Sequence, residues 1–320
     1  MAQFAQFLTY GIFALALGFL WGHAGILSFG QAIFFGIGAY SMGLVSLDML
    51  PGIPATALNG FALALAISAA FAAILGAILF YGRSLSGAYF GVATLCGAVI
   101  LEMATGRWDF VGGNNGLFGI PPLTLPAVVA EHLSDPAAQY LVAFGASLAT
   151  YLFLLWLSRT PFGTVVAAIR DNDKRAAFLG FNVPLHRTTA LVLSAMISAT
   201  AGALFATFFG FVSPTLIGAG LSTEVLIWVA VGGRGVLMAA LLGAVLVRTV
   251  ESMLSERFGS YWLLVLGAVF VVVVVFSPGG VFGRLFALQV PRRLRTHANP
   301  RIICSSASVA KPAVGNPTST

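Results

Sequence analysis

The chain has 320 residues, of which 59% are hydrophobic and only 8% are charged, and its formal net charge at pH 7 is +6. Soluble domains carry about 25% charged residues, so this composition excludes a soluble protein and predicts one embedded in a membrane. The positive charges flank apolar stretches instead of covering one face of a soluble module, which argues against nucleic acid as a partner. Cys96 and Cys304 give neither a disulfide framework nor a metal-ligand spacing, so no metal or cofactor is expected.

A helix that crosses a bilayer needs about 20 mostly apolar residues. The chain therefore predicts an all-α, polytopic bundle of about 8–10 transmembrane helices, some of them broken or re-entrant. The first stretch is interpreted as a retained helix, because no Lys or Arg precedes Arg83 and a cleavable signal begins with basic residues. The apolar stretches are 4–21, 27–47, 58–81, 88–105, 139–157, 188–211, 224–250 and 260–276.

The first half of the chain contains a glycine-rich break and a long loop. Gly22-His23-Ala24-Gly25 stands at the head of the second stretch and favours an interrupted helix. Residues 106–137 are polar and turn-rich, and we expect them to form a loop outside the membrane. Glu102 lies near the end of an apolar stretch, where a carboxylate either lines a pathway or reaches the membrane interface, and the interface is the favoured alternative.

The segment between Thr160 and Gly180 carries the most local signals. Thr160 suits a helix N-cap and Pro161 the first helical position, whereas Gly180 suits the end of a helix and Pro184 prevents its continuation. The polar block in the middle is compatible with one amphipathic helix or with two short helices joined near Asn172. Such a segment either lies on the membrane surface or forms a docking element for another chain.

In the distal half, small residues recur every fourth position along the stretch 188–211, which predicts close helix packing. The glycine-rich run at 232–235 predicts either a re-entrant break in the stretch 224–250 or a short loop between two short helices. Glu224 has the same two interpretations as Glu102. The charges of Arg248, Glu251, Glu256 and Arg257 are interpreted as a cluster at the membrane interface.

The basic residues give an orientation. Eleven of the sixteen Lys and Arg residues fall in two places, five between Arg159 and Arg187 and six between Arg284 and Lys311. Basic residues that flank apolar spans stay on the cytoplasmic side. We therefore expect a transmembrane domain at 1–283 with a cytoplasmic loop at 159–187, followed by a basic, disordered cytoplasmic tail at 284–320.

Several segments resemble one family. RTPFGTVVAAIRDNDKRAAFLGFNV, residues 159–183, is similar to the cytoplasmic loop of LivM-type permeases of branched-chain amino-acid ABC transporters. GHAGILSFGQAIFFGIGAYSMGL at 22–44, RSLSGAYFGVATL at 83–95 and GGNNGLFGIP at 112–121 resemble other segments of that family in the same order. The likeness spans residues 8–283.

The resemblance implies half of the pathway of a bacterial inner-membrane, binding-protein-dependent importer. Its expected partners are a LivH-like second permease subunit, two ABC ATPases and a periplasmic solute-binding protein, with ATP hydrolysed by the partner chain. Gly113, Asn114 and Asn115 would face the binding protein. The positions assigned to ATPase coupling are Ala168, Arg170, Asp171, Asn172, Asp173 and Gly180. The pathway candidates are Glu102, Glu224, Gly232 and Gly233.

The substrate and the transport mechanism have rival interpretations. Val236 and Ala239-Ala240 depart from the usual LivM pattern, and Asn114-Asn115 resembles related urea-transport permeases, so a urea or short-amide permease is the alternative to branched-chain amino acids. An ion-coupled transporter would leave the segment 159–187 unexplained. A membrane enzyme would need clustered acids and histidines, which the four scattered histidines do not provide.

Overall fold

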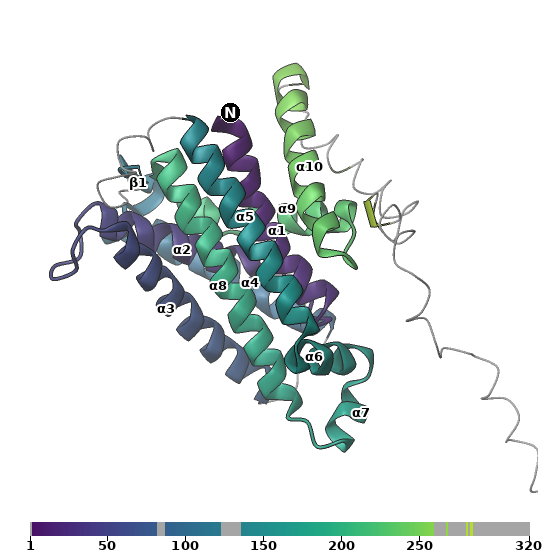
Figure 1. Ribbon diagram of the computed structural model, residues 1–320. Coiled ribbons are helices and arrows are strands. Elements are labelled where there is room, and N and C mark those ends of the chain that lie inside the picture. Colours follow the sequence, from purple (N-terminus) through teal and green to yellow (C-terminus); the bar gives the residue numbers. More distant parts are fainter. Residues whose placement is uncertain are drawn as a thin grey trace, which may run out of the picture.

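A computed structural model describes residues 2–81, 87–122 and 136–258, together with residues 267, 280, 282 and 283. Within these ranges the chain is almost entirely helical (Figure 1). The long helices are α1 (Ala2–Gly22), α2 (Gln31–Ser46), α3 (Ala57–Gly76), α4 (Ala88–Gly106), α5 (Pro136–Arg159), α8 (Val183–Phe209), α9 (Ala219–Gly232) and α10 (Leu237–Phe258). The short elements are η1 (Ala77–Tyr81), η2 (Asp109–Val111), η3 (Gly113–Asn115), β1 (Leu117–Phe118), α6 (Pro161–Asp171), α7 (Asp173–Phe178), β2 (Phe211–Val212) and η5 (Pro214–Leu216).

The predicted polytopic helical class is confirmed. Among the described residues, five helical segments are long and apolar enough to cross a membrane: Gln3–Gly22, Ala57–Tyr81, Tyr89–Gly106, Ala137–Arg159 and Val183–Phe209. α9 and α10 pass the same test only as a pair, bent by 117° at their junction. The predicted span at 260–276 and the tail at 284–320 lie outside the described residues, and each of the other predicted stretches corresponds to one of these segments, the bent pair or α2.

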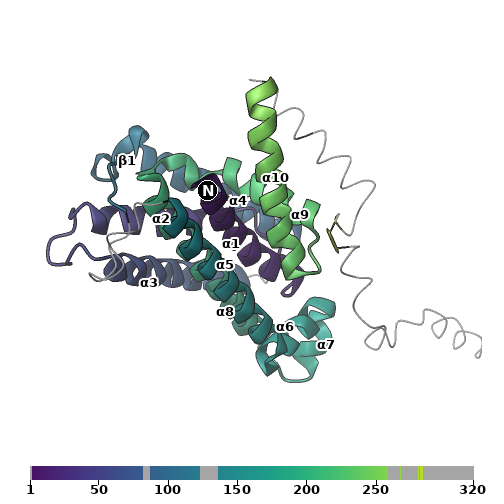
Figure 2. The ribbon, with the colours of Figure 1, turned by 45° about the horizontal axis from the view of Figure 1, so that its top comes forward.

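α1 and α8 form the centre of the bundle. Inside the protein lie 78% of the apolar window of α1 and 67% of that of α8, against 22% for α5 and 28% for α4. The views in Figures 1 and 2 agree that α1 runs between α5 and the α9–α10 pair. The outer faces of α3, α4 and α5 therefore remain available to lipid or to another subunit.

The predicted small-residue stripe on α8 is where α2 approaches. A Cβ added to Gly202 would overlap the Phe35 carbonyl, and one added to Gly38 would overlap the Ala199 carbonyl. Because apolar burial gives helices little drive to associate in lipid, such backbone proximity and buried hydrogen bonds hold the bundle. The two serines of the stripe supply such bonds: Ser194 Oγ and Ser198 Oγ accept from the Gln31 amide at 2.7 and 2.8 Å, and Ser194 Oγ donates to the Ala16 carbonyl at 2.8 Å.

The break after α1 is longer than predicted. α2 begins at Gln31 and has only 16 residues, whereas the apolar stretch began at residue 27. Residues 23–30 stay non-helical because tertiary contacts hold their backbone, including a hydrogen bond from the Phe29 N–H to Thr94 Oγ1 at 3.2 Å. Apolar content alone does not reveal such contacts, so this helix start was predicted four residues too early.

The two polar segments lie at opposite ends of the bundle. β1 and the 3-10 turns of residues 109–115 lie near the N-terminus of α1, and α6 and α7 lie at the far end of α5 and α8 (Figure 1). β1 pairs with β2 in an antiparallel register, with Leu117 opposite Val212 and Phe118 opposite Phe211. This short pairing fixes the loop after α4 to the end of α8.

Candidate coupling site and pathway residues

The segment after α5 forms two short helices, which decides between the two predicted alternatives. The Thr160 hydroxyl accepts from the Gly163 N–H at 3.4 Å and Pro161 opens α6. Asn172 is extended, and its side-chain oxygen accepts from the Arg175 N–H at 2.9 Å to begin α7. Gly180, with φ of +90°, turns the chain out of α7. Caps therefore start each helix and a glycine turns the chain after the second.

One face of this helix pair packs on the bundle, and the other is open. Val166 and Ile169 of α6 and Ala176 of α7 are buried. Phe178 is 92% exposed and Leu179 77% exposed. The turn at Asn172 shifts the phase of α7, so Leu179 becomes its C-cap and points away from the bundle.

Polar contacts tie the helix pair to the rest of the chain. Arg170 donates from Nη1 to the Gly22 carbonyl at 2.6 Å and from Nη2 to Asp171 Oδ1 at 2.9 Å. Arg187 of α8 forms an ion pair with Asp173 at 3.5 Å. Arg170 therefore connects α6 to the end of α1, and Asp173 connects α7 to the start of α8.

The two glycine-rich breaks meet beside this helix pair. A Cβ on Gly22 would overlap the Arg234 carbonyl, and one on Gly25 would overlap the stem of Arg170. The Arg234 guanidinium lies 5.6 Å from the ring centre of Trp21. The break after α1 consequently lies between α6 on one side and the α9–α10 junction on the other.

His23 lies within the first break. Burial, and secondarily the positive charge of Arg170, lower the pKa of the His23 imidazole below its ordinary value. Its Nδ1 atom is buried and has no hydrogen-bond partner within the part of the chain that the structure describes. The histidine is therefore neutral at physiological pH and packs beside Phe19, with their ring centres 5.8 Å apart.

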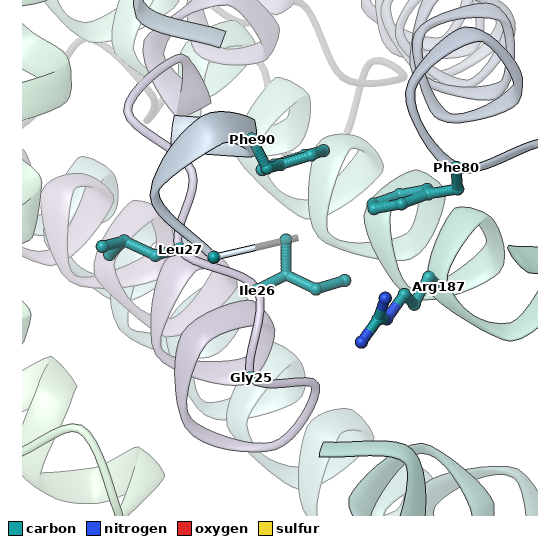
Figure 3. A pocket seen from close by; sticks show the side chains of 7 residues that line it. Gly25, Ile26, Leu27, Phe80, Phe90 and Arg187 are labelled. Atoms are coloured by element: carbon teal, nitrogen blue, oxygen red, sulfur yellow. The ribbon is translucent and has the colours of Figure 1, made fainter. Parts of the chain in front are cut away.

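A small cavity lies next to the same break (Figure 3). Ile26, Phe80, Phe90 and Arg187 surround a space of about 20 Å³, and the rings of Phe80 and Phe90 stack at 5.0 Å. This volume accommodates about one water molecule, so it cannot hold an amino acid. The guanidinium of Arg187 lies at its edge and connects it to the helix pair through Asp173.

The pathway candidates separate into two kinds of position. Gly232 packs backbone against backbone on Ala239 and Gly243, and Gly233, with φ of +129°, ends α9. Both glycines are buried and shape the turn between α9 and α10. The two carboxylates, Glu102 and Glu224, have different surroundings.

Glu102 and Glu224 do not share partners. The Glu102 carboxylate lies against Gly218, immediately before α9, and is half-buried. Glu224 lies within α9 and forms an ion pair with Arg248 of α10, with 3.7 Å between Oε2 and Nη1. Arg248 also donates to Glu251 at 2.8 Å. The structure therefore adds Glu224 to a charge cluster that the sequence had placed within the distal end of α10 alone.

The positions expected to face a binding protein lie at the other end of the molecule. Gly113, with φ of +54°, is buried, whereas Asn114 and Asn115 are exposed. Gly116 packs on the Val212 carbonyl so closely that a Cβ would overlap it. The two asparagines are thus presented on a turn that is fixed to the end of α8, while residues 123–135 lie outside the described ranges.

Two features of the site were missed by sequence reasoning. The exposure of Phe178 was not predicted, because it depends on the turn at Asn172. The contact between Glu224 and Arg248 depends on the 117° bend, which brings positions 24 residues apart together. The available signal in the sequence was an acidic residue before the glycine-rich break, Glu224, and a basic residue after it, Arg248.

A polytopic bundle with a broken helix and a compact, anchored helix pair at one end defines a membrane transport subunit. Residues 2–274 match the family described as "Branched-chain amino acid transport system / permease component", and the chain belongs to this family. The predicted resemblance is thereby confirmed, and the chain is a permease.

Curated relatives agree with this assignment. The chain is 30% identical to the high-affinity branched-chain amino acid transport system permease protein LivM of Escherichia coli (strain K12), over 86% of this chain and 68% of that protein. It is 24% identical to the probable branched-chain amino acid transport permease protein LivM of Methanocaldococcus jannaschii, over 85% and 90%. It is 25% identical to the permease protein LivH of Escherichia coli (strain K12), over 86% and 92%.

Proposed function

We propose that this permease forms half of the pathway of a binding-protein-dependent ABC importer for branched-chain amino acids. The observation that carries the proposal is the family match across residues 2–274, combined with an exposed helix pair anchored to the bundle. The expected assembly contains a LivH-like permease subunit, two ABC ATPases and a solute-binding protein in the periplasm. It resides in the bacterial inner membrane, with residues 159–187 and the tail after residue 283 on the cytoplasmic side.

In this proposal the helix pair α6–α7 is the element that docks on the ATPase. Ala168, Asp171 and Asn172 are exposed, Asp173 is half-buried, and Phe178 and Leu179 present apolar surface. An exposed apolar tip beside charged residues suits a protein partner, because such surface is rare unless it is covered. Arg170 and Gly180 serve the same element from within, by anchoring and ending it.

Motion of the ATPase would reach the pathway through the anchored contacts. Arg170 links α6 to the break after α1, and that break packs on the α9–α10 junction at Arg234. Gly232 and Gly233 give this junction its close turn, and Glu102 and Glu224 lie before and within α9. At the other end, Gly113, Asn114 and Asn115 would receive the loaded binding protein.

The departures from the LivM pattern support packing roles and not a different solute. Gly18 of α1 lies so close to Ala240 that a Cβ on the glycine would come within 2.9 Å of the alanine Cβ. Gly232 packs on the carbonyl of Ala239. Small residues at 239 and 240 therefore keep α10 close to α1 and α9, and the urea or short-amide alternative gains nothing from them.

Uptake into proteoliposomes that contain the full complex tests the proposal. Labelled leucine should accumulate only with ATP inside and the binding protein outside, and unlabelled isoleucine should compete whereas urea should not. Accumulation driven by an ion gradient without ATP would show a secondary transporter instead. Competition by urea and not by isoleucine would establish the alternative substrate.

A further inference from the structure

The spanning helix α1 and the bent pair α9–α10 bring a charge cluster together inside the bundle. Arg248 of α10 donates from Nη1 to Glu251 Oε2 at 2.8 Å and lies 3.7 Å from Glu224 Oε2 of α9. Its guanidinium carbon lies 4.3 Å from the ring centre of Tyr10 in α1. Ionisable side chains at membrane depth are costly to keep, so a group of them within one broken span indicates a function.

The arginine is incompletely paired. A guanidinium has five N–H donors, and Nη1 is the one nitrogen of Arg248 with a hydrogen-bond acceptor among the described residues. Nε of Arg248 is buried without an acceptor from the part of the chain that the structure describes, and so is Nε1 of Trp228, whose ring centre lies 5.6 Å from the guanidinium. Buried donors are nearly always paired in folded proteins, so this cluster has room for an acceptor that the described residues do not supply.

The two glutamates of the cluster are also incompletely paired among the described residues. The side chains of Glu224, Glu251 and Arg248 are 25%, 12% and 20% exposed, so the cluster is neither sealed nor open. Among the described side chains, one arginine and two glutamates leave one carboxylate without a full partner, and the 3.7 Å contact of Glu224 is the looser of the two. Lipid chains cannot solvate charged groups, so the exposed part of the cluster must meet water or protein.

We propose that this cluster is the solute-binding site of the pathway, with Arg248 taking the α-carboxylate and Glu224 the α-ammonium group of a zwitterionic amino acid. A zwitterion supplies an acceptor for the arginine and a donor for the glutamate in one small molecule, and it adds no net charge to the cluster. Urea has neither charged end, so the site selects an amino acid over a neutral amide. The inference rests on the proposed importer function.

Access to the free donors requires α10 to move relative to α1. Arg248 lies over the Tyr10 ring, and Tyr10 is itself packed against Trp228 at 5.2 Å. A pathway that opens alternately to each side must rearrange such contacts in each cycle. The junction at Gly232-Gly233, which packs beside the break next to α6, is placed to allow this movement.

The test uses the complete complex in proteoliposomes, with leucine as the solute. Arg248→Gln and Glu224→Gln are compared with Thr249→Ala, whose hydroxyl donates to the Val245 carbonyl of its own helix. Leucine uptake and the ATPase rate stimulated by leucine-loaded binding protein are both measured. Uptake by the two cluster variants should fall about tenfold or more while ATPase stimulation stays within about twofold, because solute is delivered but not held.

A second pair of variants separates a solute site from a structural ion pair. Arg248→Glu combined with Glu251→Arg keeps the pair within α10 but moves the positive charge, so uptake should stay low. Restored uptake in this double variant, or unchanged uptake in Arg248→Gln, would overturn the proposal. If Arg248→Gln aggregates, the test uses two milder variants. Arg248→Lys keeps the positive charge, and Glu224→Gln removes only the 3.7 Å contact with Arg248.

Two further outcomes have distinct meanings. A folded Arg248→Gln variant that no longer holds the second permease subunit would show that a partner's carboxylate occupies the cluster, which overturns the solute assignment. Wild-type complex that shows no ATP-driven leucine uptake would refute the importer proposal itself, and the solute site would fall with it. The first result appears only in the variant and the second in the wild type, so they cannot be confused.

Discussion

The helix pair α6–α7 and the charge cluster around Arg248 are built in opposite ways. Neighbouring residues form the pair: Thr160, Asn172 and Gly180 start and end its helices within about 20 residues of chain. The cluster is formed by residues from α1, α9 and α10 that meet only because the chain bends by 117° after Gly232. The comparison shows that local structure builds the exposed helix pair of this permease, whereas tertiary structure gathers its charge cluster.

The largest effect is expected from disrupting the turn between α9 and α10, on which the charge cluster depends. Gly232→Val places a side chain against the Ala239 carbonyl and Gly243, so α9 and α10 cannot keep their turn and the cluster separates. We expect loss of leucine uptake by the reconstituted complex. Gly235→Val is the matched control, since a Cβ there meets nothing within 4 Å and its uptake should stay near wild type. Equal loss in both variants would show that the close turn is not what matters.

Charge reversal at the exposed end of the helix pair α6–α7 tests its role in docking. Asp171→Lys with Asp173→Lys should abolish co-purification of the ATPase, because both carboxylates of the docking surface become positive and Arg187 loses its partner on α7. The permease itself should still insert in the membrane. Asp48→Lys with Asp109→Lys makes the same charge change outside this helix pair and should leave ATPase capture intact. Wild-type amounts of ATPase on the first variant would contradict the docking role.

A smaller effect is expected at the apolar tip. Phe178→Ser should weaken ATPase binding about tenfold while leaving the unfolding temperature of the permease unchanged, because this ring is 92% exposed. Ile169→Ser, on the buried face of the same pair, should instead lower stability by about 2 kcal/mol. Thermal unfolding and ATPase pull-down, measured together, would separate the two faces. The same loss of stability in both variants would show that Phe178 is packed and not presented.

The sequence predicts the local features of this permease better than the features that depend on distant residues. Thr160, Pro161 and Gly180 were assigned correctly because caps and turns depend on residues next to them. The start of α2 at Gln31 and the partner of Glu224 could not be assigned, because both depend on distant groups, Thr94 and Arg248. The glycine-rich breaks indicated that the chain would bend, but not what the bend would bring together.

The smallest expected effect concerns pH at the break that joins the two regions. Because the pKa of His23 is lowered in the folded protein, the unfolded chain binds the proton more readily. Stability should therefore be full above about pH 6.5, the ordinary pKa of histidine, and should fall as the pH drops below it. Thermal unfolding at pH 8 and pH 5.5 should show a larger decrease for the wild type than for His23→Gln. An identical decrease would show that His23 is not the titrating group.

The central claim is that the tip of α7 faces the cell interior and is covered by a separate ATPase. The most direct measurement is labelling of a Phe178→Cys variant, with Cys96 and Cys304 replaced by serine, using a membrane-impermeant maleimide. We predict that intact cells leave the new cysteine unlabelled, that inside-out vesicles stripped of ATPase label it, and that adding the ATPase back protects it. Labelling from outside intact cells, or labelling that the ATPase does not change, would contradict the account.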